Sequence, residues 1–221
     1  MSDFYRELFD KGALVFDIGA HMGNMTNIFL ENGVGKVVAL EPQLSVFKTL
    51  SQRFAFDKRV VALNFAAGIA LGKADMFVCK SADTLSTFSE KWLTGRFKGY
   101  QFVKIDRHCT IVTLDWLIAT YGMPEHIKID VEGWERSVLE GLSHPVRSLS
   151  YEFTEEFCQE ASLCAALIEK LGVYEFNYSR GDVPSFATQW NNFANIFKEI
   201  YNSLGRGGVW GNVFARIKTS N

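Results

Sequence analysis

Short apolar runs alternate along the chain with segments in which apolar side chains recur at helical spacing. The first three runs, 13–19, 36–42 and 59–64, are rich in Val, Ile and Leu and lack a clean apolar–polar alternation, which is typical of strands covered on both faces. Two later runs, 126–130 and 148–154, also predict strands. Strands that alternate with helices indicate right-handed crossovers and a parallel sheet. We therefore expect an α/β fold around a mainly parallel sheet.

The segments between these runs predict helices. The helix over 113–122 begins at Thr113, a typical N-cap, and stops at Gly122, a typical C-terminal residue. Six segments are expected to be helical, namely 24–31, 44–54, 113–122, 133–142, 160–171 and 191–204. Near the C-terminus, runs 173–179 and 209–217 are expected to pair antiparallel and close the sheet.

The middle of the chain is less regular. Segments 74–79 and 101–112 predict extended structure. Segment 81–98 is polar and has no firm period, so we expect a loop with some helix there.

Composition and charge narrow the class of protein. The chain has 221 residues, of which 48% are hydrophobic, and this suits one globular domain with a sizeable core. A net charge of −2 gives no basic bias, so binding to nucleic acid through phosphates is not indicated. No apolar run reaches the ~20 residues of a membrane span, and the N-terminus lacks a signal-peptide pattern. The four cysteines form no C-x-x-C pair, which is typical of a reducing compartment. We expect a cytoplasmic protein that binds neither nucleic acid nor membrane.

A glycine-containing turn, D-I-G-A-H-M-G, joins the first predicted strand to its helix. Gly19 and Gly23 tolerate positive φ and allow close approach of a ligand, and the next helix presents free N–H groups to the same space. Ligands of open α/β sheets bind outside the carboxyl ends of the strands. Glu41, at the end of the second strand, is placed to accept hydrogen bonds from two ribose hydroxyls. The pattern predicts a site for a nucleoside-containing cofactor.

The turn differs from the dinucleotide fingerprint G-x-G-x-x-G. His21 replaces the glycine that lets a pyrophosphate approach the backbone. Asp17 places a negative charge beside the turn, where it would repel phosphate and attract an ammonium group. S-adenosylmethionine, a nucleoside with a cationic zwitterionic tail, fits these features. The alternative is that the two glycines serve only the turn and its packing.

The stretch H-I-K-I-D-V-E-G-W-E carries a row of charges on a predicted central strand. If the strand alternates, Lys128, Asp130 and Glu132 share one face. Burial of such a row requires pairing, which Lys128 would supply with Asp130 or Glu132. Gly133 then lets the chain turn into the next helix. The two acids lie at the carboxyl end, where a ligand is expected.

The order of several segments resembles that in FkbM-type methyltransferases, which are class I S-adenosylmethionine-dependent enzymes that commonly O-methylate sugars or polyketide-like products. The matching segments are VFDIGAHMGNMT, VVALEPQ, LNFAAG, TLDWL and IKIDVEGWE. The resemblance implies a Rossmann-like three-layer sandwich with a mainly parallel seven-stranded sheet whose last strand is antiparallel. It also implies one methyltransferase domain over 1–221, with an N-terminal helix over 1–12, a core over 14–153 that holds the cofactor, and a C-terminal part over 154–221 with the closing hairpin.

Site residues follow from the resemblance position by position. It implies that the residues binding S-adenosylmethionine, and its product S-adenosylhomocysteine, are Asp17, Gly19, Ala20, His21, Gly23, Thr26, Glu41, Pro42, Asn64, Ala66 and Asp130. In this assignment the glycine turn holds the methionine part and Glu41 holds the ribose. Asn64 lies at the adenine edge, and Ala66 packs nearby.

Methyl transfer depends on placing the acceptor in line with the methyl group, and an alcohol acceptor also benefits from a base. We expect Asp130 or Glu132 to supply that base, with Lys128 as their partner, and Glu152 and Glu155 are further candidates for the same space. Two alternatives remain. In the first, the acids chelate a divalent ion, although the sequence predicts no metal site. In the second, the acids and Lys128 form only a buried ion network.

The acceptor is expected to be a small molecule or sugar, bound by loops above the sheet. These are segment 81–98, segment 179–192 and the N-terminal helix. Four aromatic residues are candidates for stacking on it, namely Trp92, Phe97, Trp190 and Phe193. His108 is a further candidate base.

Two other functions compete with an O-methyltransferase. An NAD-linked oxidoreductase is built on a similar sheet, but the missing middle glycine argues against it. A cofactor-binding domain without catalysis is the third possibility, and the retained acids at 130 and 132 argue against it.

Overall fold

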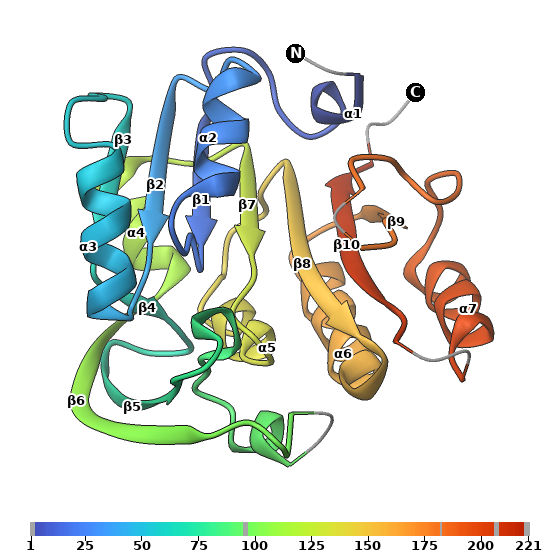
Figure 1. Ribbon diagram of the computed structural model, residues 1–221. Helices are drawn as coiled ribbons and strands as arrows, with labels where there is room; N and C mark the ends of the chain where they lie inside the picture. Colours follow the sequence, from blue (N-terminus) through green and yellow to red (C-terminus); the bar gives the residue numbers. More distant parts are fainter. Residues whose placement is uncertain (1–2, 95–96, 182, 206–207, 219–221) are drawn as a thin grey trace.

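The computed structural model describes residues 3–94, 97–181, 183–205 and 208–218, and only the backbone of 106–108 (Figure 1). Its strands are β1 (Leu14–Ile18), β2 (Lys36–Leu40), β3 (Val60–Leu63), β4 (Ala66–Ala67), β5 (Gly72–Cys79), β6 (Phe102–Val112), β7 (His126–Ile129), β8 (Ser148–Thr154), β9 (Tyr174–Tyr178) and β10 (Trp210–Ile217). Its α-helices are α1 (Asp3–Arg6), α2 (Asn24–Glu31), α3 (Leu44–Arg53), α4 (Leu114–Tyr121), α5 (Glu135–Leu139), α6 (Cys158–Glu169) and α7 (Phe193–Ser203). Three 3₁₀ turns are η1 (Asp83–Leu85), η2 (Glu90–Leu93) and η3 (Glu155–Phe157).

The described strands form a seven-stranded sheet in the order β3-β2-β1-β7-β8-β10-β9. The pairs from β3 to β8 are parallel, whereas β10 runs antiparallel to both of its neighbours. The expected mainly parallel sheet with an antiparallel last strand is therefore confirmed. The strand order reverses beside β1, so the ends of β1 and β7 border the crevice where such sheets bind ligands.

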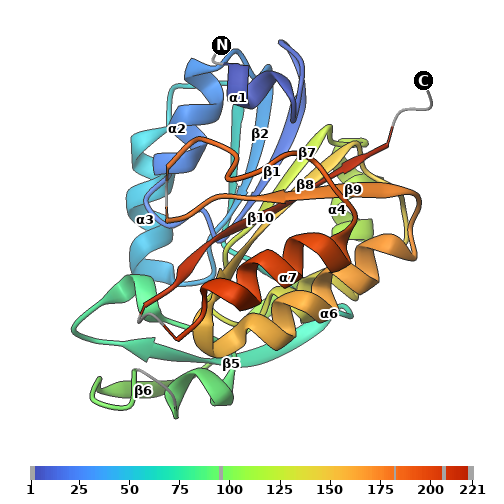
Figure 2. The ribbon, with the colours of Figure 1, turned by 90° about the vertical axis from the view of Figure 1, so that its right-hand side faces the viewer.

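Helices cover both faces of this sheet and make it the middle of three layers (Figure 2). One face packs against α1, α2 and α3 through a core that includes Phe9, Phe29 and Leu50. The other face packs against α4 to α7 through a core that includes Tyr151 and Ile200. Each layer buries apolar side chains that a helix or sheet alone would leave in water.

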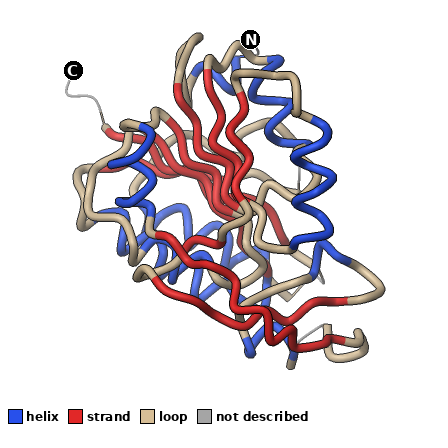
Figure 3. Tube along the Cα trace, turned by 90° about the vertical axis from the view of Figure 1, so that its left-hand side faces the viewer, coloured by secondary structure: helices blue, strands red, loops and turns tan. Residues whose placement is uncertain are grey.

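A three-stranded sheet, β4-β6-β5, lies below the carboxyl ends of the parallel strands (Figures 1 and 3). The two segments expected to be extended form β5 and β6, which pair antiparallel, and β6 also pairs parallel with β4. Strand β4 is only two residues long and was not predicted, because so short a run has no readable period. Segment 81–98 holds η1 and η2, in agreement with a loop that contains some helix.

The N-terminal helix is shorter than expected. Instead of covering 1–12, α1 ends at Arg6. Asp10 leaves the helical path because its backbone N–H donates to Glu125 (2.9 Å) and its carboxylate pairs with Arg147 (2.6 Å). The division of the chain into one domain with a core over 14–153 stays a prediction. Among the described residues, no helix is long and apolar enough to cross a membrane.

Candidate functional site

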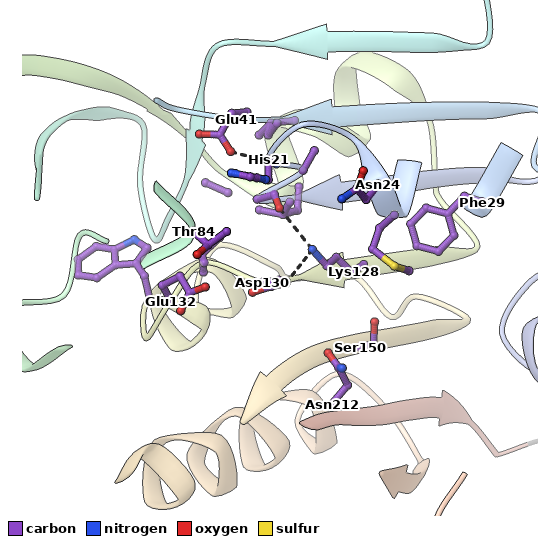
Figure 4. Close-up of a pocket in the computed structure, with 18 of the residues that line it drawn as sticks. His21, Asn24, Phe29, Glu41, Thr84, Lys128, Asp130, Glu132, Ser150 and Asn212 are labelled. Carbon is purple, nitrogen blue, oxygen red and sulfur yellow. Dashed lines mark hydrogen bonds and ion pairs between the residues drawn. The ribbon is translucent and has the colours of Figure 1, made fainter. Parts of the chain in front are cut away.

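A cavity of about 540 Å³ opens at the carboxyl ends of β1, β2 and β7, and its volume is in the range of about 300–1,000 Å³ that is typical of small-molecule sites. Figure 4 shows its two regions, with Glu41 and His21 on one side of Lys128 and with Ser150 and Asn212 on the other. We call the second region the inner chamber. It is bounded by His126, Lys128, Ser150 and Asn212 on the sheet and by Tyr5, Leu8, Ile28 and Phe29 opposite.

The turn after β1 is held against two neighbouring strands. The backbone N–H groups of Gly19 and Ala20 donate to the carbonyl of Leu40 at 3.0 and 2.8 Å. Gly19 has φ +79°, and a Cβ at this position would lie 1.8 Å from the carbonyl oxygen of Asp130. Only glycine fits this contact. The turn therefore brings its backbone to the cavity at a fixed place between β2 and β7.

Glu41 is buried at the end of β2. Its carboxylate accepts backbone N–H groups of His21 (3.1 Å) and Gln43 (2.7 Å). Burial raises the pKa of Glu41 to about 7, although these two hydrogen bonds and the charge of Lys128 act in the opposite direction. Each carboxylate oxygen keeps a lone pair for a ligand, because only one hydrogen bond is made to each.

Lys128 links the turn to the end of β7. Its Nζ lies 3.1 Å from Asp130, 3.6 Å from Asp17 and 3.3 Å from the carbonyl oxygen of Gly19. Burial alone would lower the pKa of Lys128, but the carboxylates of Asp130 and Asp17 outweigh it and raise the pKa. The expected pairing is thus made with Asp130 and Asp17 rather than with Glu132. Nζ thus donates hydrogen bonds to Asp130 and to the Gly19 carbonyl, whereas Asp17 pairs with it by charge at a longer distance.

The loop after β7 is strained and tightly held. Glu132 has φ +55°, so the strand alternation expected for Lys128, Asp130 and Glu132 stops before Glu132. The buried Glu135 accepts the backbone N–H groups of Val131 (3.0 Å) and Gly133 (3.2 Å). Among the described residues, the two non-glycine residues with positive φ are Glu132 and His21, and both line the cavity. Such strain is found mainly at functional sites.

Three carboxylates converge on this loop. Asp130, Glu132 and Glu152 each offer an oxygen within 4.8 Å of the others. Burial, and then the neighbouring Glu152 and Asp130 carboxylates, raise the pKa of Glu132 well above its usual value. The site thus offers a carboxyl group that takes up a proton more readily than a solvated one. Glu155 lies elsewhere, where it accepts the backbone N–H of Gly205 (2.8 Å).

Most of the predicted site residues meet at the cavity. Those that line it are Gly19, Ala20, His21, Glu41, Pro42, Ala66, Lys128, Asp130 and Glu132. The other four, Asp17, Gly23, Thr26 and Asn64, do not line it. Direct contact of these four residues with the cofactor stays a prediction.

Each of these four residues supports the site from behind. Asp17 is fully buried and accepts a hydrogen bond from the Thr26 hydroxyl at 2.6 Å. A Cβ on Gly23 would lie 2.4 Å from the Phe54 ring. The Asn64 amide donates to the carbonyls of Glu41 and Pro42, at 2.9 Å each, and so fixes the chain after β2.

The three expected acceptor segments all reach the cavity, through residues such as Tyr5, Thr84 and Val183. The four aromatic candidates for stacking do not line it, namely Trp92, Phe97, Trp190 and Phe193. Trp92, for example, is buried and stacks on Phe97 with ring centroids 4.7 Å apart. The side chain of His108 lies outside the described part of the chain.

The sequence reasoning missed the inner chamber. Ser150 and Asn212 come from β8 and β10, which are neighbours in the sheet. A signal was present for Ser150, because polar residues alternate with apolar ones in S-L-S-Y-E. This alternation indicates a sheet face that apolar helices do not fully cover.

The sheet order and the site at the β1 turn define a Rossmann-like α/β domain. The family described as the methyltransferase FkbM domain matches residues 17–186, and the chain belongs to this family of S-adenosylmethionine-dependent methyltransferases. A comparison with curated protein sequences gives no match.

Two solved structures are similar to the chain at low identity. One is precorrin-6y C5,15-methyltransferase from Geobacter metallireducens, with 10% identity, 97% of this chain and 85% of that chain covered, and a TM-score of 0.48. The other is an rRNA methylase from Streptococcus thermophilus, with 13% identity, 98% and 93% covered, and a TM-score of 0.48.

Proposed function

We propose that this methyltransferase transfers the methyl group of S-adenosylmethionine to a hydroxyl of a small molecule bound in the inner chamber. The observation that carries the proposal is one continuous cavity that joins the glycine turn to the carboxylates of Asp130 and Glu132 and then to the chamber. The family membership favours this function over an NAD-linked oxidoreductase.

The residues of the first region fit the cofactor. The backbone of the turn lines the cavity at Gly19, Ala20 and His21, where it suits the methionine part. The two free lone pairs of Glu41 suit two ribose hydroxyls. The apolar side chains of Phe65, Ala66 and Met76 give the adenine ring a low-polarity slot. When bound, the cofactor supplies an electrophilic methyl group on its sulfonium.

A small acceptor is favoured because the inner chamber is enclosed. Ser150, Leu8 and Phe29 are 4%, 1% and 1% exposed. A polymer backbone does not fit past walls so deeply buried, whereas a ring-sized molecule does.

Asp130 and Glu132 are placed to act on the acceptor hydroxyl. Asp130 is held by Lys128 and keeps 37% of its side chain exposed, whereas Glu132 has the raised pKa. A carboxylate at this position orients the hydroxyl and takes its proton as the new bond forms. We assign the base to this pair of acids.

The proposal is tested by calorimetry on the wild type and Asp130→Asn, followed by turnover with a panel of ring-bearing alcohols. We expect S-adenosylmethionine and S-adenosylhomocysteine to bind both proteins and NAD to bind neither. Turnover by Asp130→Asn, measured as S-adenosylhomocysteine formed, is expected to fall about 100-fold, the usual contribution of general base catalysis. Addition of magnesium in parallel samples tests the chelation alternative.

Three outcomes would contradict the proposal. Absence of binding by both sulfur compounds to folded protein would remove the cofactor assignment. Binding without turnover of any alcohol would favour a non-catalytic domain, and turnover only with RNA would overturn the small-molecule acceptor. Unchanged turnover of Asp130→Asn would remove Asp130 from the mechanism.

The raised pKa of Glu41 predicts how cofactor affinity depends on pH. In the folded protein Glu41 is protonated below pH 7, whereas the unfolded chain ionises it above about 4.5. The group therefore destabilises the free protein as pH rises from about 4.5 to 7. Because the ionised carboxylate is the better acceptor for ribose hydroxyls, we expect S-adenosylhomocysteine affinity to rise by up to about tenfold per pH unit below 7.

Calorimetry across this pH range checks the rise in affinity. The charges of Lys128 and Asp17 act on the pKa of Glu41, and both are present in the matched variant Glu41→Gln. Glu41→Gln is expected to bind S-adenosylhomocysteine weakly, and its affinity is expected not to rise with pH. A rise that survives in Glu41→Gln would assign the titration to another group.

A further inference from the structure

A chain of hydrogen bonds fixes how Ser150 meets the inner chamber. The Ser148 hydroxyl donates its proton to a backbone carbonyl, that of Leu8 (2.6 Å) or Glu125 (3.1 Å). It therefore accepts a hydrogen bond from Nδ1 of His126, 2.8 Å away. Burial lowers the pKa of His126 to about 3, so the ring is neutral and its Nε2 carries no proton.

The same chain leaves Ser150 with a free acceptor. Since Nε2 of His126 accepts, the Ser150 hydroxyl donates to it at 3.1 Å. The lone pairs of the Ser150 oxygen then remain for a ligand, and Ser150 lines the cavity. The chamber thus presents a hydrogen-bond acceptor of fixed polarity, suited to a hydroxyl that donates.

Two neighbouring polar groups have unused hydrogen-bonding capacity. The side-chain amide of Asn212 lines the chamber and has no hydrogen-bond partner among the described residues. The Tyr5 hydroxyl likewise has no partner in the described part of the chain, although Tyr5 is only 7% exposed. Both residues line the cavity, whose volume is in the range of small-molecule sites, so these polar groups are available to a ligand there.

This polar group lies apart from the acids that act on the reacting hydroxyl. Ser150 is in register with Lys128, and Asp130 follows Lys128 by two residues. Strands lie about 4.8 Å apart and rise about 3.3 Å per residue, which separates the backbones of Ser150 and Asp130 by about 8 Å. Apolar side chains of Leu8, Ile28 and Phe29 enclose the space opposite.

We propose that Ser150 and Asn212 form a second polar anchor of the acceptor site, which binds a hydroxyl other than the one that is methylated on a ring-bearing acceptor. This inference rests on the proposed function. It makes Ser150 and Asn212 specificity-determining residues that select acceptors with two hydroxyl groups over those with one.

The test compares matched pairs of probes by calorimetry, with the protein both free and saturated with S-adenosylhomocysteine. The pairs are phenol with hydroquinone and 2-naphthol with 2,6-dihydroxynaphthalene. For at least one pair we expect the diol to bind about five- to tenfold more tightly, as one added hydrogen bond to a buried neutral group gives. Ser150→Ala and Asn212→Leu are each expected to reduce this ratio towards one.

Thr154→Val is the matched control, because Thr154 is a buried residue of β8 that does not line the cavity and whose hydroxyl has no hydrogen-bond partner among the described residues. This variant should keep the wild-type ratio of diol affinity to mono-alcohol affinity. Equal affinity within both pairs, a ratio that survives in both variants, or absence of binding by all four probes would overturn the anchor. Because the free protein is also titrated, failure of S-adenosylhomocysteine to bind would overturn the proposed function separately.

Discussion

Replacing Gly19 with alanine is expected to weaken S-adenosylhomocysteine binding by at least about 100-fold and to lower the free energy of unfolding by about 2–4 kcal/mol. The new Cβ would lie 1.8 Å from the backbone oxygen of Asp130. The turn must therefore move away from β7, since no flexible side chain is there to yield. Such a shift displaces both the backbone of the turn that lines the cavity and the carbonyl of Gly19 that binds Lys128.

Gly12→Ala is the matched control for this change. Gly12 has φ +84°, close to the value of +79° at Gly19, but a Cβ there meets nothing within 4 Å. Gly12→Ala therefore introduces only backbone strain, which costs about 1 kcal/mol, and should leave S-adenosylhomocysteine binding unchanged. Urea unfolding and calorimetry of the two variants separate strain from collision. If Gly19→Ala behaved like Gly12→Ala in both measurements, the contact with Asp130 would not constrain the turn.

Replacing Lys128 with methionine is expected to lower the free energy of unfolding by about 3–5 kcal/mol. Asp17 is fully buried, and its Oδ1 has Lys128 as its nearest partner, at 3.6 Å. Without the ammonium group this carboxylate stays buried and uncompensated. Adding Asp17→Asn to the variant removes that charge and should recover part of the loss, as a double-mutant cycle would measure.

Lys104→Met serves as the control for the loss of a lysine. Lys104 pairs with Asp75 at 3.2 Å, but its side chain is 53% exposed. A pair in solvent contributes at most about 1 kcal/mol. Urea unfolding that gave the same small loss for both lysine variants would show that the network around Asp17 is not needed for stability.

The sheet was predictable because its strands are apolar runs, and most of these runs have a helical segment after them. The run that holds Asp17 and the one that holds Glu41 became β1 and β2, which are neighbours in the sheet. Glu41 and Asp130 were also predictable, since the carboxyl ends of parallel strands meet at one edge of a sheet. Local pattern and strand order suffice for these features.

Other features depend on contacts that no local pattern records. Glu132 has a left-handed backbone, a conformation that favours glycine, and the glycine of this segment is the next residue, Gly133. The conformation of Glu132 is therefore imposed by the structure around it. The two N–H groups of the Asn64 amide donate to the carbonyls of Glu41 and Pro42, a contact between neighbouring strands that no local pattern predicts. The inner chamber joins Tyr5 to Asn212, which are near opposite ends of the chain.

The separation of these chamber residues along the chain bears on the order of folding. The cofactor turn and Glu41 belong to neighbouring strands, whose contacts span few residues. The chamber lacks Asn212 until β10 has inserted between β8 and β9. It also needs the start of the chain to dock on β8, where the hydrogen bond from Ser148 to Leu8 joins residues 140 positions apart, farther than any strand pairing of the sheet. Contacts of long sequence separation form late because they carry the larger loop-closure entropy. The acceptor pocket is therefore the last part of the site to assemble, after the place for the methyl donor.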